Sequence, residues 1–400
     1  MIALVGGDLV LPDRVHAGAS LMIDGDRIAG VEPGRAEPAD AEVVDVSGCY
    51  LVPGFVDVHV HGVCGYDTLD GGDAIARIAA ALPRFGVTSF CPTTVACPPD
   101  ELRGFLDRVR LARIVADPLS ARVLPAHLES NFINLEYRGA QPATCLRLPP
   151  GLDEVQQAYL SDPGEYSGVQ VLSAIAVSRA DVGIVTLAPE LPGGIDLIRS
   201  LVRAGHLVSL GHSGADFYTA VAAIEAGATH ATHLFNRMTP LGHRSPGLAG
   251  AILTRAEITA ELICDGYHVH PAMCGLAIAA KGPAGVMAIT DGTSGSGQPV
   301  GSVGRLGGRA IHVRDEAAFL DDGTLAGSTL TMDRAFQNIV TRFGRSLVEA
   351  AQMCATTPAR QLGLAHAGRI AVGAMADVVV LDRELKVVCT VIGGEQAWPE

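Results

Sequence analysis

Lysine is almost absent from this chain of 400 residues. Only Lys281 and Lys386 occur, so arginine carries nearly all of the positive charge. Acidic residues outnumber basic ones, and the formal net charge of -14 argues against a surface for nucleic acid or an anionic membrane. The charge does not exclude a small anionic ligand, because such a ligand needs only a local basic pocket.

The cysteines form no Cys-x-x-Cys pair. They are odd in number and dispersed, which is typical of reduced thiols that fill core space in a cytosolic protein. No apolar run resembles a membrane span, since stretches such as 75–82 are short and interrupted by Arg77. The N-terminus lacks the basic region and apolar core of a signal peptide. We therefore expect a cytoplasmic protein with no membrane partner.

What the chain does contain is apolar. Hydrophobic residues make up 48% of it and glycine is abundant, as in a well-buried globular protein. The length exceeds what one small core can use and fits a large barrel with a smaller companion domain.

Both ends of the chain show short strand patterns. Residues 2–5, 19–28 and 42–46 read as strands, and the Asp24-Gly25 pair is a hairpin signal. The tail shows the same character at 368–382 and 385–392. These ends predict one small β-sandwich domain, built from residues 1–52 together with 360–400.

The centre of the chain alternates strands with helical segments. Eight such units predict a TIM-like (β/α)8 barrel of class α/β over residues 53–359. A glycine-rich excursion at 292–327, with a hairpin near 310–313, is expected before a helix at 328–343. The expected strands are 52–61, 86–94, 122–129, 182–189, 206–212, 229–234, 258–265 and 285–291, and expected helices include 74–82, 99–116, 194–204, 216–226 and 271–280.

Metal-competent side chains stand at the ends of these strands. His59 and His61 are two residues apart, so on a strand they point to the same face. In a barrel the carboxyl ends of all strands share one mouth, where active sites lie. The candidates at these ends are His59, His61, Glu129, His212, His233 and Asp291.

Imidazole and carboxylate side chains suit a catalytic divalent ion. The five histidine and glutamate positions suffice for one ion or for two ions bridged by Glu129, and the identity stays open among Zn, Fe, Mn and Co. Asp291 is expected to take a proton from the attacking water and pass it to a leaving group. Each residue alone has an ordinary explanation: His233 could be a core histidine and His212 a turn residue. Their combination favours a metal site.

The motif Pro-Gly-Phe-Val-Asp-Val-His-Val-His at 53–61 resembles the opening metal motif of the amidohydrolase superfamily. The pattern Gly-x-Ile-x-x-Gly-x-x-Ala-Asp at 368–377 resembles the return strand of that superfamily. Within it, the chain resembles the N-acetylglucosamine-6-phosphate deacetylases along its whole length. The segments that carry this resemblance are 127–129, 211–213, 232–238, 244–250, 265–268, 290–291 and 326–329.

The resemblance implies a role for each matching residue. Glu129, His212 and His233 match the metal ligands that the family always uses, and His59 and His61 match members that hold a second ion. Asp291 matches the general base and acid. The residues implied in substrate binding are Asn236, Arg244 and His268, with Arg244 supplied by the neighbouring subunit of a homodimer.

Charge on the loop after His233 agrees with an anionic substrate. Arg237 and Arg244 lie on this loop with His243 beside them, and guanidinium groups suit phosphate. A solvated basic loop is the alternative. Some amidohydrolases bridge two ions with a carboxylated lysine on the fourth strand, but no lysine precedes Lys281 here, so Glu129 on the third strand is the available substitute.

Two departures from the family stand out. Ser130 and Asn131 replace the usual Gly-Pro after the ligand glutamate, and Gln141 replaces a histidine that is thought to polarise the acyl carbonyl. Glutamine can donate a hydrogen bond but carries no charge. Either a second metal at His59 and His61 polarises the carbonyl, or the substrate differs. We favour the first explanation and include Gln141 among the substrate-binding candidates.

The expected function is hydrolysis of the N-acetyl amide of N-acetylglucosamine 6-phosphate. The alternative within the superfamily is deacylation of N-acetylgalactosamine 6-phosphate or of another N-acyl compound. A non-catalytic binding protein on an inherited barrel is a third hypothesis. Asp291 and the five ligand positions are all present, which argues against it.

Overall fold

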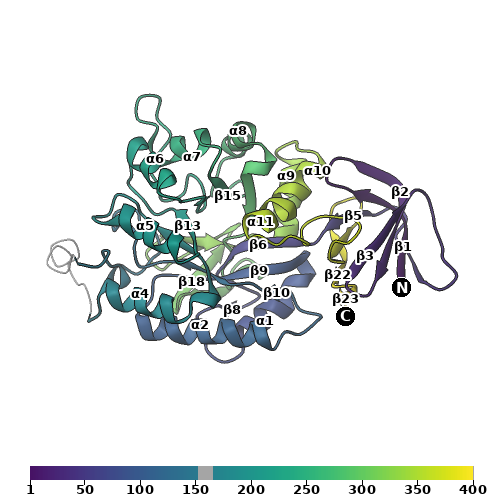
Figure 1. The fold of residues 1–400 in the computed structure, drawn as a ribbon, viewed down its shortest axis with the longest axis horizontal. Helices are drawn as coiled ribbons and strands as arrows, with labels where there is room; N and C mark the ends of the chain where they lie inside the picture. Colours follow the sequence, from purple (N-terminus) through teal and green to yellow (C-terminus); the bar gives the residue numbers. More distant parts are fainter. Residues whose placement is uncertain (152–164, 400) are drawn as a thin grey trace.

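The computed structural model describes residues 1–151 and 165–399. A barrel of strands and helices fills one side of the molecule, and a β-domain made from both chain ends lies at the other side (Figure 1). The predicted architecture, a (β/α)8 barrel with a β-sandwich from the termini, is confirmed.

The terminal domain joins the two ends of the chain through one strand pair. Strand β5 pairs with β21, with Leu51 opposite Val380, and places the N-terminal strands beside the C-terminal ones. The predicted hairpin at Gly25 is confirmed, with β2 and β3 on its two sides. The order is β23-β22-β21-β5-β1-β2-β3 with β4 on β1, and the bounds are β1 Ile2–Val10, β2 Val15–Asp24, β3 Arg27–Glu32, β4 Glu42–Asp45, β5 Tyr50–Pro53, β21 Val378–Leu381, β22 Val387–Ile392 and β23 Glu395–Trp398.

The single strand expected at 52–61 is wrong, because the segment divides into two strands in different sheets. Strand β5 ends at Pro53 and β6, Phe55–Val60, begins the barrel. Gly54 makes the transition: a Cβ there would lie 2.4 Å from the Thr88 side chain. Apolar residues continue through the junction, so the pattern gave no sign of it. The proposed division at 52/53 lies beside this junction, and that at 359/360 falls within α11, Thr357–Gln361; both remain predictions.

Parallel strands form the barrel. Strand β6 pairs with β9, and pairing then runs through β11, β12, β13, β14 and β15 to β16. An isolated bridge between Val60 and Gly292 closes the ring, and the backbone amides of His61 and Gly62 donate to the carbonyl of Gly292 at 2.8 Å. The bounds are β9 Val87–Thr94, β10 Arg122–Val123, β11 Ala126–Glu129, β12 Val182–Leu187, β13 Leu207–Leu210, β14 His230–Ala231, β15 Thr259–Ile263 and β16 Val286–Ile289.

Helices cover the outside of the barrel as expected. Helix α5 shows why: Leu197, Ile198 and Leu201 are buried on one side. The five expected helices are confirmed, whereas α4 and α7 were not expected. The bounds are α1 Ala74–Ala81, α2 Pro99–Ile114, α4 Gly168–Val177, α5 Gly194–Arg203, α6 Phe217–Glu225, α7 Gly247–Thr254, α8 Pro271–Lys281, α9 Met332–Thr341 and α10 Leu347–Ala351.

The glycine-rich excursion is an antiparallel sheet of β17 Val303–Leu306, β18 Arg309–Arg314, β19 Ala317–Phe319 and β20 Leu325–Ser328. The predicted hairpin is confirmed, with Ile311 opposite Gly304. The helix expected from residue 328 begins later, as α9, because the chain first completes β20. This sheet brings Leu306 and Leu325 to the mouth of the barrel.

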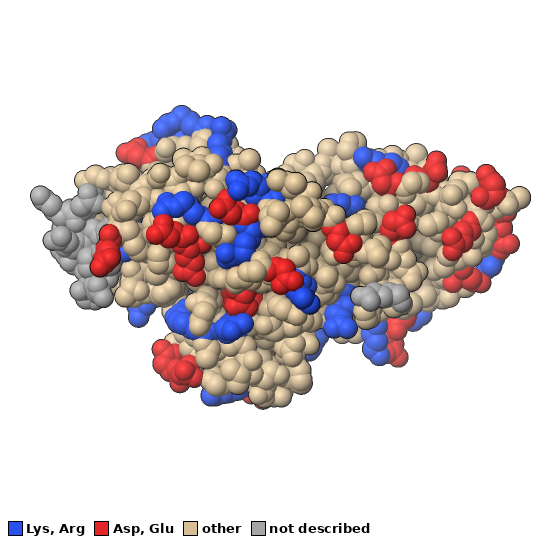
Figure 2. Space-filling model, turned by 90° about the horizontal axis from the view of Figure 1, so that it is seen from below, with Lys and Arg blue, Asp and Glu red and all other residues tan. Residues whose placement is uncertain are grey.

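Charge differs between the two parts of the molecule. Figure 2 shows acidic side chains gathered over the end that carries the terminal domain, whereas both signs are mixed over the barrel. An ion pair joins the two parts: Nη1 of Arg122 lies 2.6 Å from Oδ2 of Asp377, whose side chain is 3% exposed. Among the described residues, every helix falls short of the length and apolarity that crossing a membrane requires.

Candidate active site

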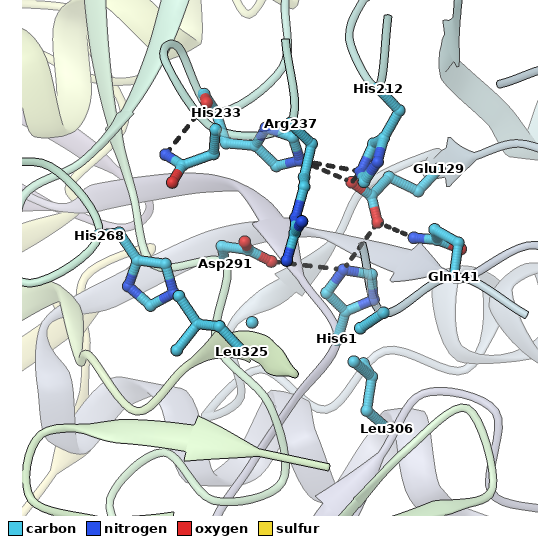
Figure 3. Close-up of a pocket in the computed structure, with 13 residues that line it drawn as sticks. His61, Glu129, Gln141, His212, His233, Arg237, His268, Asp291, Leu306 and Leu325 are labelled. Carbon is cyan, nitrogen blue, oxygen red and sulfur yellow. Dashed lines mark hydrogen bonds and ion pairs between the residues drawn. The ribbon is translucent and has the colours of Figure 1, made fainter. Parts of the chain in front are cut away.

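The six metal and catalytic candidates converge at the C-terminal mouth of the barrel. Each stands at the end of its strand or within two residues of it, and all are buried. Figure 3 shows most of them pointing toward one another at the floor of a pocket. The structure brings together His59, His61, Glu129, His212, His233 and Asp291.

Glu129 forms one group with His212 and His233. The two imidazole Nε2 atoms lie 2.7 and 2.9 Å from Oε1 of Glu129 and 3.0 Å from each other. All three side chains are at most 5% exposed. The three atoms therefore face one shared point.

The two histidines of the His-x-His motif form a second group beside the first. Their Nε2 atoms are 3.2 Å apart, and each lies 3.4 Å from Oδ1 of Asp291. Nε2 of His61 is also 3.5 Å from Oε2 of Glu129. Nε2 of His59 lies 4.0 Å from Oε1 of the same carboxylate, so Glu129 borders both groups.

Electrostatics in this cluster favour positive charge. Burial alone would raise the pKa of Glu129, but the charge and hydrogen bond of His212, with those of His233 and His61, hold this pKa well below its usual range. Burial would lower the pKa of His61, but hydrogen bonds and charge from Asp291 and Glu129 raise it to about 10. The carboxylates therefore stabilise positive charge at this point, and a divalent cation would supply that charge in place of protonated imidazoles.

The donor set fits a divalent metal. Nδ1 of His212 lies 2.8 Å from the carbonyl oxygen of Tyr137, which can only accept, so this nitrogen carries the hydrogen. Nε2 of His212 then faces an oxygen of Glu129 either as the N–H of an imidazolium or as the lone pair of a ligand that shares a cation with this carboxylate. Tetrahedral zinc sites use this ligand chemistry, with Zn–N distances of about 2.0–2.1 Å.

Three site residues adopt a left-handed backbone. The φ angles are 48° for His212, 29° for His233 and 47° for Asp291, which is uncommon outside glycine. At Asp291, the amide donates to the carbonyl of His59 at 3.0 Å and the carbonyl accepts from the Ser328 amide at 2.8 Å. These bonds hold the bend that directs the carboxylate into the pocket.

Gln141 is bonded at both ends of its amide group. The oxygen accepts from the backbone N–H of Ala96 at 2.7 Å, and the nitrogen donates to Oε2 of Glu129. Its side chain lies in the pocket wall beside Glu129 (Figure 3). The structure therefore engages Gln141 with a candidate metal ligand.

A pocket opens above these residues. Of the substrate candidates, Asn236, Arg237, His268 and Gln141 line it, and Figure 3 shows Arg237 extending into it. His268 is oriented by Asp265, whose Oδ2 lies 2.6 Å from Nδ1. The Nε2 atom of His268 is buried and has no hydrogen-bond partner among the described residues, so it is available to a ligand.

Arg244 lies apart from this pocket within the single chain. Its side chain is exposed, and its guanidinium contacts only the neighbouring His243, at 2.7 Å, among the hydrogen bonds of the described residues. The one chain therefore does not bring Arg244 to its own site.

Sequence reasoning missed a buried polar layer below the site. Glu261 on β15 lies under His59 and His233, while His127 and His230 contact it or lie close to it. The available signal was a glutamate inside the apolar strand 259–263, because glutamate is almost never fully buried without partners.

Comparison with known proteins gives a consistent answer. A model of the amidohydrolase family matches residues 50–397. The chain is 36% identical over 352 residues to N-acetylglucosamine-6-phosphate deacetylase of Lysinibacillus sphaericus, which covers 87% of this chain and 85% of the relative. It is 35% identical over 373 residues to N-acetylgalactosamine-6-phosphate deacetylase of Escherichia coli O157:H7, covering 93% and 94%.

Solved structures resemble the whole chain. N-acetylglucosamine-6-phosphate deacetylase of Pasteurella multocida matches with a TM-score of 0.88, 27% identity and 99% coverage of both chains. A mutant of the Mycobacterium smegmatis enzyme, in complex with N-acetyl-D-glucosamine-6-phosphate, matches with a TM-score of 0.87, 32% identity and 99% coverage of both chains.

Proposed function

This chain belongs to the amidohydrolase family, and from that premise we propose that it hydrolyses the N-acetyl amide of N-acetylglucosamine 6-phosphate. The products are glucosamine 6-phosphate and acetate. The observation that carries the proposal is the convergence of Glu129, His212 and His233 beside Asp291 at the floor of the pocket. Relatives of this activity, similar over most of the chain, support the substrate.

A divalent metal would be held by Glu129, His212 and His233, and a second ion by His59 and His61 together with Glu129. When bound, such an ion supplies Lewis acidity that activates water and polarises a carbonyl. The His and Glu ligands accept Zn, Fe, Mn or Co. One or two ions, and which metal, are the finer points of this proposal.

Asp291 moves the proton in the proposed reaction. Burial would raise the pKa of Asp291, but the charge of His59 and the contacts with His61 and His233 lower it, so the carboxylate is ready to accept a proton at neutral pH. It takes this proton from the attacking water and returns it to the sugar nitrogen. The nitrogen needs it, because an amine anion is a poor leaving group.

The wall of the pocket holds the rest of the substrate. Asn236, Arg237 and His268 are proposed to bind the sugar phosphate, with His268 presenting the free Nε2 described above. Arg244 is proposed to complete the site of a partner chain in a homodimer, which agrees with its distance from its own pocket. A guanidinium group can pair with two oxygens of a phosphate at once, which gives it geometric selectivity.

N-acetylgalactosamine 6-phosphate is the second candidate substrate, since a relative with that activity is 35% identical to this chain. A deacetylation panel separates the two. N-acetylglucosamine, N-acetylgalactosamine and N-acetylmannosamine 6-phosphates are compared with their unphosphorylated forms, and metal is quantified in the same sample. The highest kcat/KM is expected for N-acetylglucosamine 6-phosphate, and equal rates on unphosphorylated sugars would contradict the proposal.

The cellular location also remains a proposal. All nine cysteines are free thiols in the structure, a state that suits the cytoplasm. Fractionation of the native host, with an activity assay on each fraction, tests it.

A further inference from the structure

Below the pocket floor, one fully buried carboxylate contacts both groups of candidate metal ligands. Oε2 of Glu261 lies 2.9 Å from Nδ1 of His59 and accepts from the backbone N–H of His233 at 3.1 Å. Glu261 is 0% exposed. It comes from β15, a strand that contributes none of the candidate ligands.

The contact with His59 determines which nitrogen of that imidazole faces the pocket. A carboxylate oxygen only accepts, so Nδ1 of His59 carries a hydrogen, and the neutral imidazole that a metal would bind then has its lone pair on Nε2. That Nε2 lies 3.2 Å from Nε2 of His61 and 3.4 Å from Oδ1 of Asp291. Glu261 therefore sets His59 in the form that can bind a metal.

The other oxygen of Glu261 is held as well. Nε2 of His230 lies 2.8 Å from Oε1, which prevents the carboxylate from rotating away from His59. The ring of His127 packs edge-on against that of His59, with centroids 4.6 Å apart, and its Nε2 lies 2.8 Å from the hydroxyl oxygen of Thr186. The imidazole of His59 is thus confined by a bond on one side and a ring on another.

A purely structural role for this layer is the alternative. Burying a carboxylate is costly, and an apolar residue would fill a barrel interior at least as well. A carboxylate with a purely structural role would have no reason to bond both to the side chain of one candidate ligand, His59, and to the backbone N–H of another, His233. Glu261 does both, which ties it to the geometry of the site.

We propose that Glu261 is a positioning residue that forms the second metal position by orienting His59. The inference rests on the proposed use of His59 as a metal ligand. It goes beyond the ligand set because Glu261 contacts His59 from behind, at Nδ1, and does not line the pocket. Its effect on the reaction passes through His59.

The test is metal stoichiometry and affinity in Glu261→Gln. The wild-type enzyme is stripped with a chelator and reloaded with graded zinc, and bound metal per chain is measured by mass spectrometry. The wild-type enzyme is expected to bind two ions. Glu261→Gln is expected to bind one ion, or to bind the second with about 10–100-fold weaker affinity, which is the usual effect of losing the hydrogen-bond partner of a ligating histidine. The remaining ion should bind with unchanged affinity.

Two further variants separate positioning from structure. His230→Gln alters the same buried layer but keeps a donor for Oε1 of Glu261, so both ions should still bind. In the background of His59→Gln, adding Glu261→Gln should cause no further loss of metal, because the residue acts through His59. Should Glu261→Gln fail to fold, Glu261→Asp, which keeps the charge but shortens the reach, should show the same selective loss.

Failure of the Glu261 proposal and failure of the proposed deacetylase function give different results. Two ions at wild-type affinity in Glu261→Gln, or equal loss in His230→Gln, would overturn the positioning role. A wild-type enzyme that deacetylates with one bound ion would also overturn it, while the proposed function would stand. A wild-type enzyme that binds two ions without deacetylating would overturn only the function.

Discussion

The side-chain amide of Gln141 donates to Glu129, the carboxylate that borders both groups of candidate metal ligands. The opposite end of the amide is held by the backbone of Ala96. Glutamine at this position therefore orients a carboxylate, whereas a histidine there is thought to act on the acyl carbonyl. The contact favours a role for Gln141 in orienting Glu129 over a role in binding the substrate, two roles that the sequence alone leaves open.

Gln141→Ala should weaken metal binding by about 10–100-fold, because Glu129 loses the donor that orients it. The measurement is the zinc affinity in competition with a chromogenic chelator. Asn236→Ala is the matched control, since Asn236 lines the same pocket and, within the described part of the chain, its side chain donates only to the backbone carbonyls of His233 and Leu234. Unchanged metal affinity with a lower kcat would assign Gln141 to the substrate instead.

Asp291→Asn should lower kcat by about 10²–10⁴-fold, because an amide cannot accept the proton of water and return it. Metal content should stay near wild type, since Glu129, His212 and His233 remain. Both quantities are measured on the same preparation. Wild-type turnover in this variant would remove Asp291 from the proton transfer.

Arg244→Ala should raise KM strongly for a phosphorylated substrate and change kcat much less, because the guanidinium is proposed to bind the phosphate, away from the amide. The homodimer proposal adds a sharper test. Mixed after reversible dissociation, the inactive Asp291→Asn and the impaired Arg244→Ala chains should give heterodimers with one intact site. Recovery of low-KM activity in the mixture supports donation of Arg244 between subunits. Its absence, with subunit exchange verified, contradicts it.

Removing metal should abolish activity and destabilise the fold. The folded chain gathers Glu129, His212 and His233 at one point, so a bound metal stabilises it, and a ligand present at 1,000 times its Kd contributes about 4 kcal/mol. The thermal midpoint is followed before and after chelation. Zinc, iron, manganese and cobalt are then added back separately, and the metal that restores most activity identifies the cofactor. Full activity of a demonstrably metal-free enzyme is the contradicting result.

Arg122→Met should destabilise the protein by about 2 kcal/mol, because it leaves Asp377 buried without its charge partner. This loss of free energy is smaller than for a fully buried ion pair, because the guanidinium of Arg122 is partly exposed to solvent. Chemical denaturation gives the free energy of unfolding. Arg14→Met is the control, because the exposed pair of Arg14 with Asp13 should contribute less than about 1 kcal/mol. Equal effects of the two substitutions would contradict the role of the Arg122 pair.

Much of the fold and site could be predicted because the relevant rules are local. Alternating strands and helices indicate a barrel, and His59, Glu129 and Asp291 could be grouped because parallel strand ends share one mouth. The break at Gly54 escaped prediction, since apolar residues run through it on both sides. Thr88, on another strand, leaves no room for a side chain at position 54, and a local pattern does not contain that contact.

The sequence by itself determined which residue types stand at the strand ends and the kind of chemistry they offer. Only the tertiary structure decided how they are paired: that Oε1 of Glu129 faces His212 and His233 while Oε2 faces His61, and that Glu261 lies behind His59, 202 residues away in the chain. The reason is physical. The periodicity of a strand determines on which face of the sheet a side chain lies. The distances between side chains on different strands depend on closure of the barrel and on packing. The His-x-His pair could therefore be found from its spacing, but the carboxylate that orients it could be found only in the closed barrel.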